Sequence, residues 1–327
     1  MTLELLESNP SRQTTLSVDR FCSVARTVEI LSDAWMFLVL RESFFGARRF
    51  EHFQSRLQLP RNTLVIRLNK LTELGLMVKV GYSAGQTRYE YRLSDQGRDL
   101  YPTMLALMQY GDKWLSGDQP PPLQLIHKVC GKESFAEVVC SSCESSIDPH
   151  DVQYRSGPGA GQQVRDPARK RSRRASDPEV LERVRPCSVA RTLQIIGDRW
   201  SFLLIREMFF GVRRFDVLQE NIGIATNILT DRLQRLTSHG IVQKQAYQVR
   251  PERFEYRFTT KGHDLYGSMI VMMRWGDKWL SAGQPPLLLT HTKCQHDFHA
   301  QVVCSACRQE LFAGEMGYRL RYDLTPE

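Results

Sequence analysis

The chain contains the same block of sequence twice, and this repeat limits its fold more than any other feature. Residues 22–46 read CSVARTVEILSDAWMFLVLRESFFG and residues 187–211 read CSVARTLQIIGDRWSFLLIREMFFG, so 16 of 25 positions are identical at an offset of 165. The offset continues to GDKWL at residues 111–115 and 276–280. A repeat of this length is longer than any solenoid unit, and it indicates that a whole domain was duplicated.

Composition indicates a globular protein with an anionic partner. The chain is 42% hydrophobic and 24% charged, with a formal net charge of +8, a balance that suits nucleic acid as the partner. No apolar run approaches the ~18 residues of a membrane span, and residues 1–20 lack the apolar core of a signal peptide. We therefore expect a cytoplasmic, nucleoid-associated protein without a membrane partner. In that compartment its eight cysteines would be reduced thiols, metal ligands or redox sensors.

Each copy carries helical and strand periodicities in one order. In the first copy, apolar spacing predicts helices over 23–31, 34–41, 50–57 and 61–74, strands over 77–82 and 88–93, and a closing helix over 97–114. This order is typical of a winged helix-turn-helix module. The fourth helix presents Leu64, Leu68 and Leu71 as an apolar stripe, matched in the second copy by Leu229, Leu233 and Leu236. The stripe leaves Asn62, Thr63, Ile66, Arg67 and Lys70 towards solvent.

The predicted fold class is mainly α with small β wings (α+β). We expect two winged helix-turn-helix domains at 21–118 and 186–283, each followed by a small zinc-ribbon-like β tail, at 119–150 and 284–327. Residues 1–20 would be an N-terminal extension, and 151–185 a flexible linker that contains GPGAG and RKRSRR. The basic run either contacts phosphate non-specifically or serves solubility alone.

A pattern of metal-binding residue types follows each closing helix. The spacing H-x2-C-x9-C-x2-C gives His127, Cys130, Cys140 and Cys143 in the first copy, and His291, Cys294, Cys304 and Cys307 in the second. Zinc prefers four nitrogen or sulfur ligands in a tetrahedron, so we expect one structural Zn²⁺ in each tail, formed within one copy. The alternatives are buried thiols, a redox-active Cys140–Cys143 pair, or ligation by His296 or His299 in place of His291.

Several shared motifs resemble those of the HxlR family of bacterial winged-helix regulators. They are C-x-V-A-R-T, D-x-W, R-E, F-F-G-x-R-R-F, R-L-x-x-L and G-D-K-W. The resemblance implies a DNA-binding transcriptional regulator in which terminal helices pair two modules, one recognition helix serving each half-site. Two modules in one chain would then form an internal pseudo-dimer, with further homodimerisation still open. Cys22 and Cys187 match a cysteine through which some members sense electrophiles or oxidants; the alternative is a small buried hydrophobic side chain.

Double-stranded DNA is the expected partner, and a recognition helix reads it with its N-terminal residues. Base contacts are expected from Arg61, Asn62, Thr63 and Arg67, and from Thr226, Asn227, Ile228 and Arg232. Phosphate contacts are expected from Arg48, Arg49, Lys70 and Arg88, and from Arg213, Arg214, Arg235 and Arg253. Arg88 and Arg253 have an alternative role in ion pairs with Glu90 or Glu255. Because Arg61 corresponds to Thr226, the two half-sites are expected to differ.

The sequence therefore predicts a repressor on a pseudo-palindromic operator, gated by a thiol or by an unidentified small-molecule effector. The alternative is a protein-interaction scaffold of winged helices and zinc ribbons that does not read DNA. We find no phosphate loop, nucleophile elbow or paired-carboxylate motif in the sequence, so an enzyme is not expected.

Overall fold

The computed structural model describes residues 18–31, 33–81, 89–164, 182, 185–250 and 252–322. The first module consists of α1 (Ser23–Leu31), α2 (Ala34–Phe44), α3 (Phe50–Leu57), α4 (Arg61–Glu73), the wing strands β2 (Met77–Gly81) and β3 (Tyr89–Leu93), α5 (Asp95–Arg98) and α6 (Tyr101–Trp114). The second consists of α8 (Ser188–Ile196), α9 (Arg199–Phe209), α10 (Phe215–Ile222), α11 (Thr226–Ser238), β9 (Val242–Val249), β10 (Glu252–Phe258), α12 (Thr260–His263) and α13 (Leu265–Leu280). These elements confirm the predicted mix of helices with small β wings.

Local sequence explains where these helices begin and end. The aspartate of each D-x-W motif is an N-cap: the Asp33 carboxylate accepts a hydrogen bond from the Met36 amide, and Asp198 accepts from the Trp200 and Ser201 amides. The predicted leucine stripe of α4 is fully buried, and so is that of α11. Gly75, which follows α4, has a φ of +73°, a conformation that favours glycine at a helix end.

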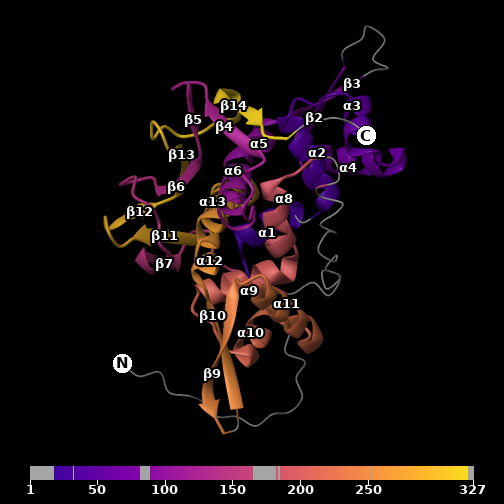
Figure 1. Cartoon of the computed structure of the whole chain (residues 1–327). Coiled ribbons are helices and arrows are strands. Elements are labelled where there is room, and N and C mark those ends of the chain that lie inside the picture. The colour runs from indigo at the N-terminus through magenta and orange to yellow at the C-terminus, as the bar shows by residue number, and fades with distance from the viewer. Residues whose placement is uncertain are drawn as a thin grey trace.

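The two modules exchange their terminal helices. Helix α1 of the first copy packs against α13 of the second, and α8 of the second packs against α6 of the first. The Ser23 hydroxyl donates to the Asp277 carboxylate at 2.5 Å, and the Ser188 hydroxyl donates to Asp112 at the same distance. Figure 1 shows these four helices at the centre of the molecule, with the two wings pointing to opposite ends. The two modules therefore share one hydrophobic core and are not separate domains.

Every residue of the GDKW motif has a role in this exchange. A Cβ at Gly111 would lie 2.2 Å from the Ser188 carbonyl oxygen, and one at Gly276 would lie 2.6 Å from that of Ser23. The lysine and tryptophan of each motif then bind an aspartate of the opposite copy. The Trp114 indole donates to Asp264 at 2.8 Å and Lys113 pairs with it at 2.6 Å; Trp279 and Lys278 reach Asp99 at 2.7 and 2.9 Å.

Burial raises the pKa of the Asp112 and Asp277 carboxyls to about 6, despite the serine hydroxyls that bond them. In the unfolded chain these groups titrate near 4, so between about pH 4 and 6 the folded state binds more protons than the unfolded state. We therefore expect these two groups to make the free energy of unfolding fall as the pH rises through this window. In urea unfolding at several pH values, the D112N/D277N variant should lose that part of the slope; an unchanged slope would contradict the assignment.

The tails are interwoven as well. The first supplies β4 (Leu123–His127), β5 (Lys132–Ser134), β6 (Ala136–Cys140), the 3-10 turn η1 (Pro149–Asp151) and β7 (Val152–Ser156). The second supplies β11 (Leu287–His291), β12 (His296–Phe298), β13 (Ala300–Cys304), the 3-10 turn η3 (Ala313–Glu315) and β14 (Met316–Leu320). Strands β4, β6 and β7 pair antiparallel with β14, β13 and β11 of the other copy. The tails therefore form one strand assembly, on the left in Figure 1, instead of two independent ribbons.

The segment expected to be a linker from residue 151 begins with ordered structure. Strand β7 pairs with β11, and β8 (Gln162–Val164) pairs with β1 (Val18–Arg20). The sequence did not reveal this because each strand finds its partner in a distant part of the chain. The basic run RKRSRR lies outside the described residues. Among the helices that are described, none is long and apolar enough to cross a membrane.

Candidate DNA-binding surface and metal centres

The recognition helices present different residues at their first turns. On α4, Arg61 and Asn62 are exposed and Thr63 is half-buried; on α11, Thr226 and Asn227 are exposed, whereas Ile228 packs against the core. The Arg61 guanidinium lies over the Phe50 ring, 5.0 Å from its centroid. In the described part of the chain, neither helix has a side-chain hydrogen bond at its N-cap, so the first-turn amides remain available to an acceptor such as phosphate.

Two arginines expected to contact bases, Arg67 and Arg232, each form an ion pair within their own module. Arg67 Nε lies 3.1 Å from Asp33 Oδ1, and Arg232 Nε lies 2.9 Å from Asp198 Oδ1. Their side chains are only 20% and 13% exposed, so the expectation that Arg67 faces solvent is wrong. The carboxylate that caps α2 or α9 thus also ties that helix to the recognition helix. The signal was present in the sequence as an aspartate and an arginine 34 residues apart in both copies.

The residues expected at phosphate are mostly exposed, and several have partners. Arg48, Arg213 and Arg253 are exposed. Arg49 lies 3.8 Å from Glu90, Arg214 pairs with Asp216 at 2.5 Å, Lys70 lies 3.3 Å from Glu73, and Arg235 donates to the Gln194 carbonyl. Arg88 lies outside the described residues. The carboxylates Glu90 and Glu255, considered as partners of Arg88 and Arg253, accept from Arg92 and Arg257.

The backbone of the RRF motif docks onto the wing in both copies. The Tyr91 amide donates to the Arg48 carbonyl at 2.7 Å, and the Tyr256 amide donates to that of Arg213 at 2.9 Å. These bonds fix the exposed arginines beside the wing strands, and the recognition helices α4 and α11 pack against the wing strands β2 and β9. In Figure 1, α4 and α11 both lie on the right, away from the strand assembly.

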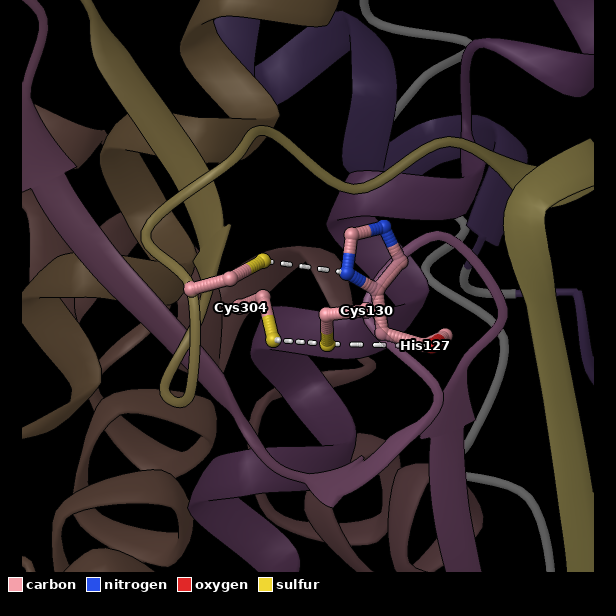
Figure 2. A group of neighbouring side chains, drawn as sticks. His127, Cys130 and Cys304 are labelled. Carbon is pink, nitrogen blue, oxygen red and sulfur yellow. Dashed lines mark hydrogen bonds between the residues drawn. The ribbon is translucent and has the colours of Figure 1, made fainter.

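The histidines and cysteines of the tails form two clusters, and each cluster takes residues from both copies. His127 and Cys130 lie with Cys304 and Cys307, and Cys140 and Cys143 lie with His291 and Cys294; within a cluster the ligand atoms are all within 4.8 Å of one another. Figure 2 shows the first cluster, in which Cys130 Sγ is 4.0 Å from Cys304 Sγ and His127 Nδ1 is 3.3 Å from Cys307 Sγ. In the second, His291 Nδ1 is 3.3 Å from Cys143 Sγ and 3.7 Å from Cys294 Sγ.

The expectation of one cluster within each copy is therefore wrong, and the strand register explains why. Strands β6 and β13 run antiparallel, with Cys140 opposite Ala300 and Cys304 opposite Ala136. The two C-x2-C turns consequently lie at opposite ends of this ladder. At each end, the turn meets the H-x2-C segment of the other copy, which is separated from that copy's ladder strand by the short strand β5 or β12. His296 and His299 belong to neither cluster.

The clusters fit a tetrahedral metal ion by ligand type and spacing. Zinc bound at about 2.3 Å to sulfur and about 2.0 Å to nitrogen places neighbouring ligands roughly 3.5–3.8 Å apart, close to the distances observed. Both histidines are fully buried. A hydrogen bond with the Ser145 hydroxyl is the main cause that lowers the pKa of the Cys143 thiol, to about 6, and a thiolate is the form that binds metal.

Cys22 and Cys187 are half-buried at the starts of α1 and α8. The arginine one turn beyond each cysteine is engaged elsewhere: Arg26 donates to the Leu280 carbonyl at 2.8 Å, and Arg191 pairs with Glu182 at 2.9 Å. A cation of the other copy, Arg206, interacts with Cys22. Burial acts to lower the pKa of this guanidinium, but Cys22 and Glu207 outweigh burial and raise it. Sequence reasoning missed Arg206 because the contact depends on the exchange of helices.

Two winged modules that carry exposed recognition helices and share one core define a winged helix-turn-helix regulator. The HxlR-like helix-turn-helix family model matches residues 30–119 and 195–284, more than half of the chain. The protein therefore belongs to this family and is a transcriptional regulator of the HxlR type. The family and its relatives' names indicate a regulator and not an enzyme.

The curated relatives agree with this assignment. The uncharacterized HTH-type transcriptional regulator MT3179 of Mycobacterium tuberculosis is 42% identical over 137 residues, which are 42% of this chain and 87% of the relative. A Synechocystis regulator of the same type, sll1512, is 35% identical over 29% of this chain and 70% of its own length. The crystal structure of PA1607, described as a candidate transcription factor, is 40% identical over 30% of this chain and 69% of its own, with a TM-score of 0.28.

Proposed function

We propose that the chain represses transcription by binding one pseudo-palindromic operator with both of its modules. The observation that carries the proposal is the exchange of α1 and α8 between modules. It holds the two recognition helices at a fixed spacing within one polypeptide, as two half-sites on one face of a duplex would require. Such half-sites lie about 34–36 Å apart on DNA. The two helices differ at their first turns, so the half-sites would differ in sequence.

We further propose that each cluster holds one structural Zn²⁺. Four ligands close each site and leave no position for a substrate water, so the metal would stabilise the tails without taking part in a reaction. The ligands of either ion come from both copies, so each ion would join the two halves of the chain. Gating of DNA binding by Cys22, Cys187 or a small effector also belongs to this proposal, supported by the thiol of Cys22 beside the Arg206 cation.

The operator is tested by selection from a random DNA library with the full-length protein. We expect a two-part site with unlike halves, and binding that weakens steeply with salt, as phosphate contacts require. Two identical optimal half-sites would contradict unequal reading. Weak binding to every sequence with little salt dependence would instead favour the interaction scaffold and overturn the proposal.

Replacing Arg61 tests which half each module reads. Arg61→Ala is expected to weaken operator binding by about 1–3 kcal/mol, roughly 5–150-fold, and to relax sequence preference in one half-site only. The matched variant Thr226→Ala removes a shorter side chain, which accepts a bond from Gln219 at 2.8 Å, so its effect should be smaller and confined to the other half. Quantitative footprinting on the selected operator measures both effects. Equal losses in both halves would contradict the assignment.

A further inference from the structure

The interface between the copies contains two cavities that correspond by the repeat. One is lined by Cys22, Arg206, Phe209, Tyr266 and Met273, and the other by their equivalents Cys187, Arg41, Phe44, Tyr101 and Met108. Their volumes are very different, at about 590 Å³ and about 100 Å³ respectively. The two cavities arose from one site by duplication, and their volumes have since diverged.

The smaller cavity is occupied by the chain itself. The Arg185 side chain is 7% exposed, lies 4.3 Å from the centroid of the Phe45 ring and pairs with the buried Glu42 carboxylate at 2.9 Å. A cation of the chain itself, stacked on an aromatic ring and paired with a carboxylate, therefore takes up this part of the interface.

The larger cavity has a wall built from the glycine-rich segment that we expected to be flexible. The Gly157 and Gly159 amides donate to the Pro286 and Pro285 carbonyls at 3.0 and 3.1 Å, and the Phe21 amide donates to Gly161 at 3.0 Å. A Cβ at Gly157 would lie 2.2 Å from the Pro285 carbonyl oxygen, so this approach requires glycine. The GPGAG sequence is therefore a docked wall of the cavity, and Ala160 and Gly161 line it.

The chemistry of the lining favours a flat anion. Phe209, Phe210 and two tyrosines form aromatic surfaces, and Met269 and Met273 are side chains that adapt to the shape of a ligand. The polar groups include the Arg206 guanidinium, held in orientation by Glu207 at 2.7 Å. Of the other charged lining residues, Asp277 is bonded to Ser23 and Arg155 is paired with Asp297. Arg206 is also paired, but its bonds to Glu207 use Nε and Nη2, and we assign this oriented guanidinium as the cation that meets a ligand carboxylate.

We propose that the larger cavity binds one small aromatic carboxylate per chain. The volume is in the range of small-molecule sites. The ring would lie among Phe209, Phe210 and the methionines, and the carboxylate would meet Arg206. The filled cavity around Arg185 binds none, so the stoichiometry is one and not two.

The regulatory part of this inference rests on the proposed function. Phe209 lies at the end of α9, and its ring is 4.4 Å from the ring of Phe258 on wing strand β10. Helix α9 also packs against the recognition helix α11. A ligand against Phe209 therefore acts on the second module directly. We expect it to change binding at the half-site read by α11 more than at the half-site read by α4.

The site is tested without DNA, by calorimetric titration of the full chain with benzoate and 1-naphthoate. Their neutral counterparts, benzyl alcohol and 1-naphthylmethanol, have similar shapes without the charge. We expect at least one acid to bind with a stoichiometry near one, and its neutral counterpart to bind about tenfold or more weakly. Failure of both acids to bind, equal binding of the neutral compounds, or a stoichiometry of two would overturn the site.

Matched variants locate the binding. Met273→Trp fills the larger cavity and should abolish binding, whereas Met108→Trp at the equivalent position of the smaller cavity should leave it unchanged. Circular dichroism and operator affinity without ligand check that each variant folds. Arg206→Lys keeps the charge but loses the planar guanidinium. It should weaken binding of the acid without changing binding of the neutral compound. Binding that survives Met273→Trp in a folded protein would refute the location.

A separate footprint with the bound acid then tests regulation. If the acid changes binding mainly at the half-site read by the second module, the regulatory role is supported. Binding of the acid without any such change would remove the regulatory role and keep the site, and an absence of specific DNA binding would count against the proposed function alone.

Discussion

A chain that carries both Cys130→Ser and Cys304→Ser is expected to retain one Zn²⁺, whereas a chain with Cys130→Ser and Cys140→Ser is expected to lose both. The first pair belongs to one cluster although it comes from two copies; the second pair belongs to one copy but to two clusters. Clusters formed within each copy would give the opposite result. Metal analysis of the purified proteins distinguishes the two arrangements directly, with the single variants and Cys22→Ser as controls.

The thermal stability of these variants should fall with each Zn²⁺ that is lost. A structural zinc site contributes an apparent binding free energy on the order of 10 kcal/mol in small zinc domains, and here each ion joins strands of both copies. We therefore expect the variant without metal to lose cooperative unfolding of the strand assembly and the variant with one ion to keep part of it. Thermal unfolding followed by circular dichroism provides the measurement. Full stability after chelation of both ions would show that the clusters have no structural role.

Alanine at both Gly111 and Gly276 is expected to destabilise the exchanged helices strongly. Each new Cβ would lie 2.6 Å or less from a backbone carbonyl oxygen of the opposite copy, and backbone moves less readily than a side chain. Overpacking of this kind costs about 1–3 kcal/mol per site, and the two sites are far enough apart for the costs to add. The expected result in urea unfolding is therefore a loss of roughly 2–6 kcal/mol.

Gly314→Ala is the matched control for this experiment, because a Cβ there has no neighbour within 4 Å. Its free energy of unfolding should stay close to that of the unchanged chain. If the Gly111→Ala, Gly276→Ala double variant were as stable as this control, the close approach of α8 to α6 and of α1 to α13 would have to be abandoned.

Much of each module was predictable because its determinants are local. The limits of α1 and α3 agree with the helical spacing of their apolar residues, and Gly75 ends α4 through its own backbone conformation. The buried leucine stripes follow from the same periodicity. The metal-binding residue types were also identified from the sequence, because a C-x2-C turn brings two thiols together whatever surrounds it.

The remaining features depend on which copy supplies the partner, and in a duplicated sequence both copies offer the same motifs. The sequence offers two chemically equal C-x2-C turns as partners for Cys130. The register of β6 on β13 decides that the partners are Cys304 and Cys307. The helical period predicts that Arg67 faces solvent beside the apolar stripe, whereas its partner Asp33 caps a different helix. The GPGAG segment has the composition of a linker, yet Gly157 and Gly159 are needed for close contact with Gln284 and Pro285.

The exchange of helices and strands has a consequence for synthesis of the protein. Helix α1 is synthesised roughly 240 residues before α13, against which it packs. Strand β4 is likewise synthesised long before its partner β14, which lies near the end of the described chain. Until then the first copy exposes the apolar face of α1 and an unpaired strand edge, which are sites of aggregation in nascent chains. Pairing over such separations is also slow to form. We therefore expect the yield of native protein in the cell to depend on chaperones that hold the first half while the second is being translated.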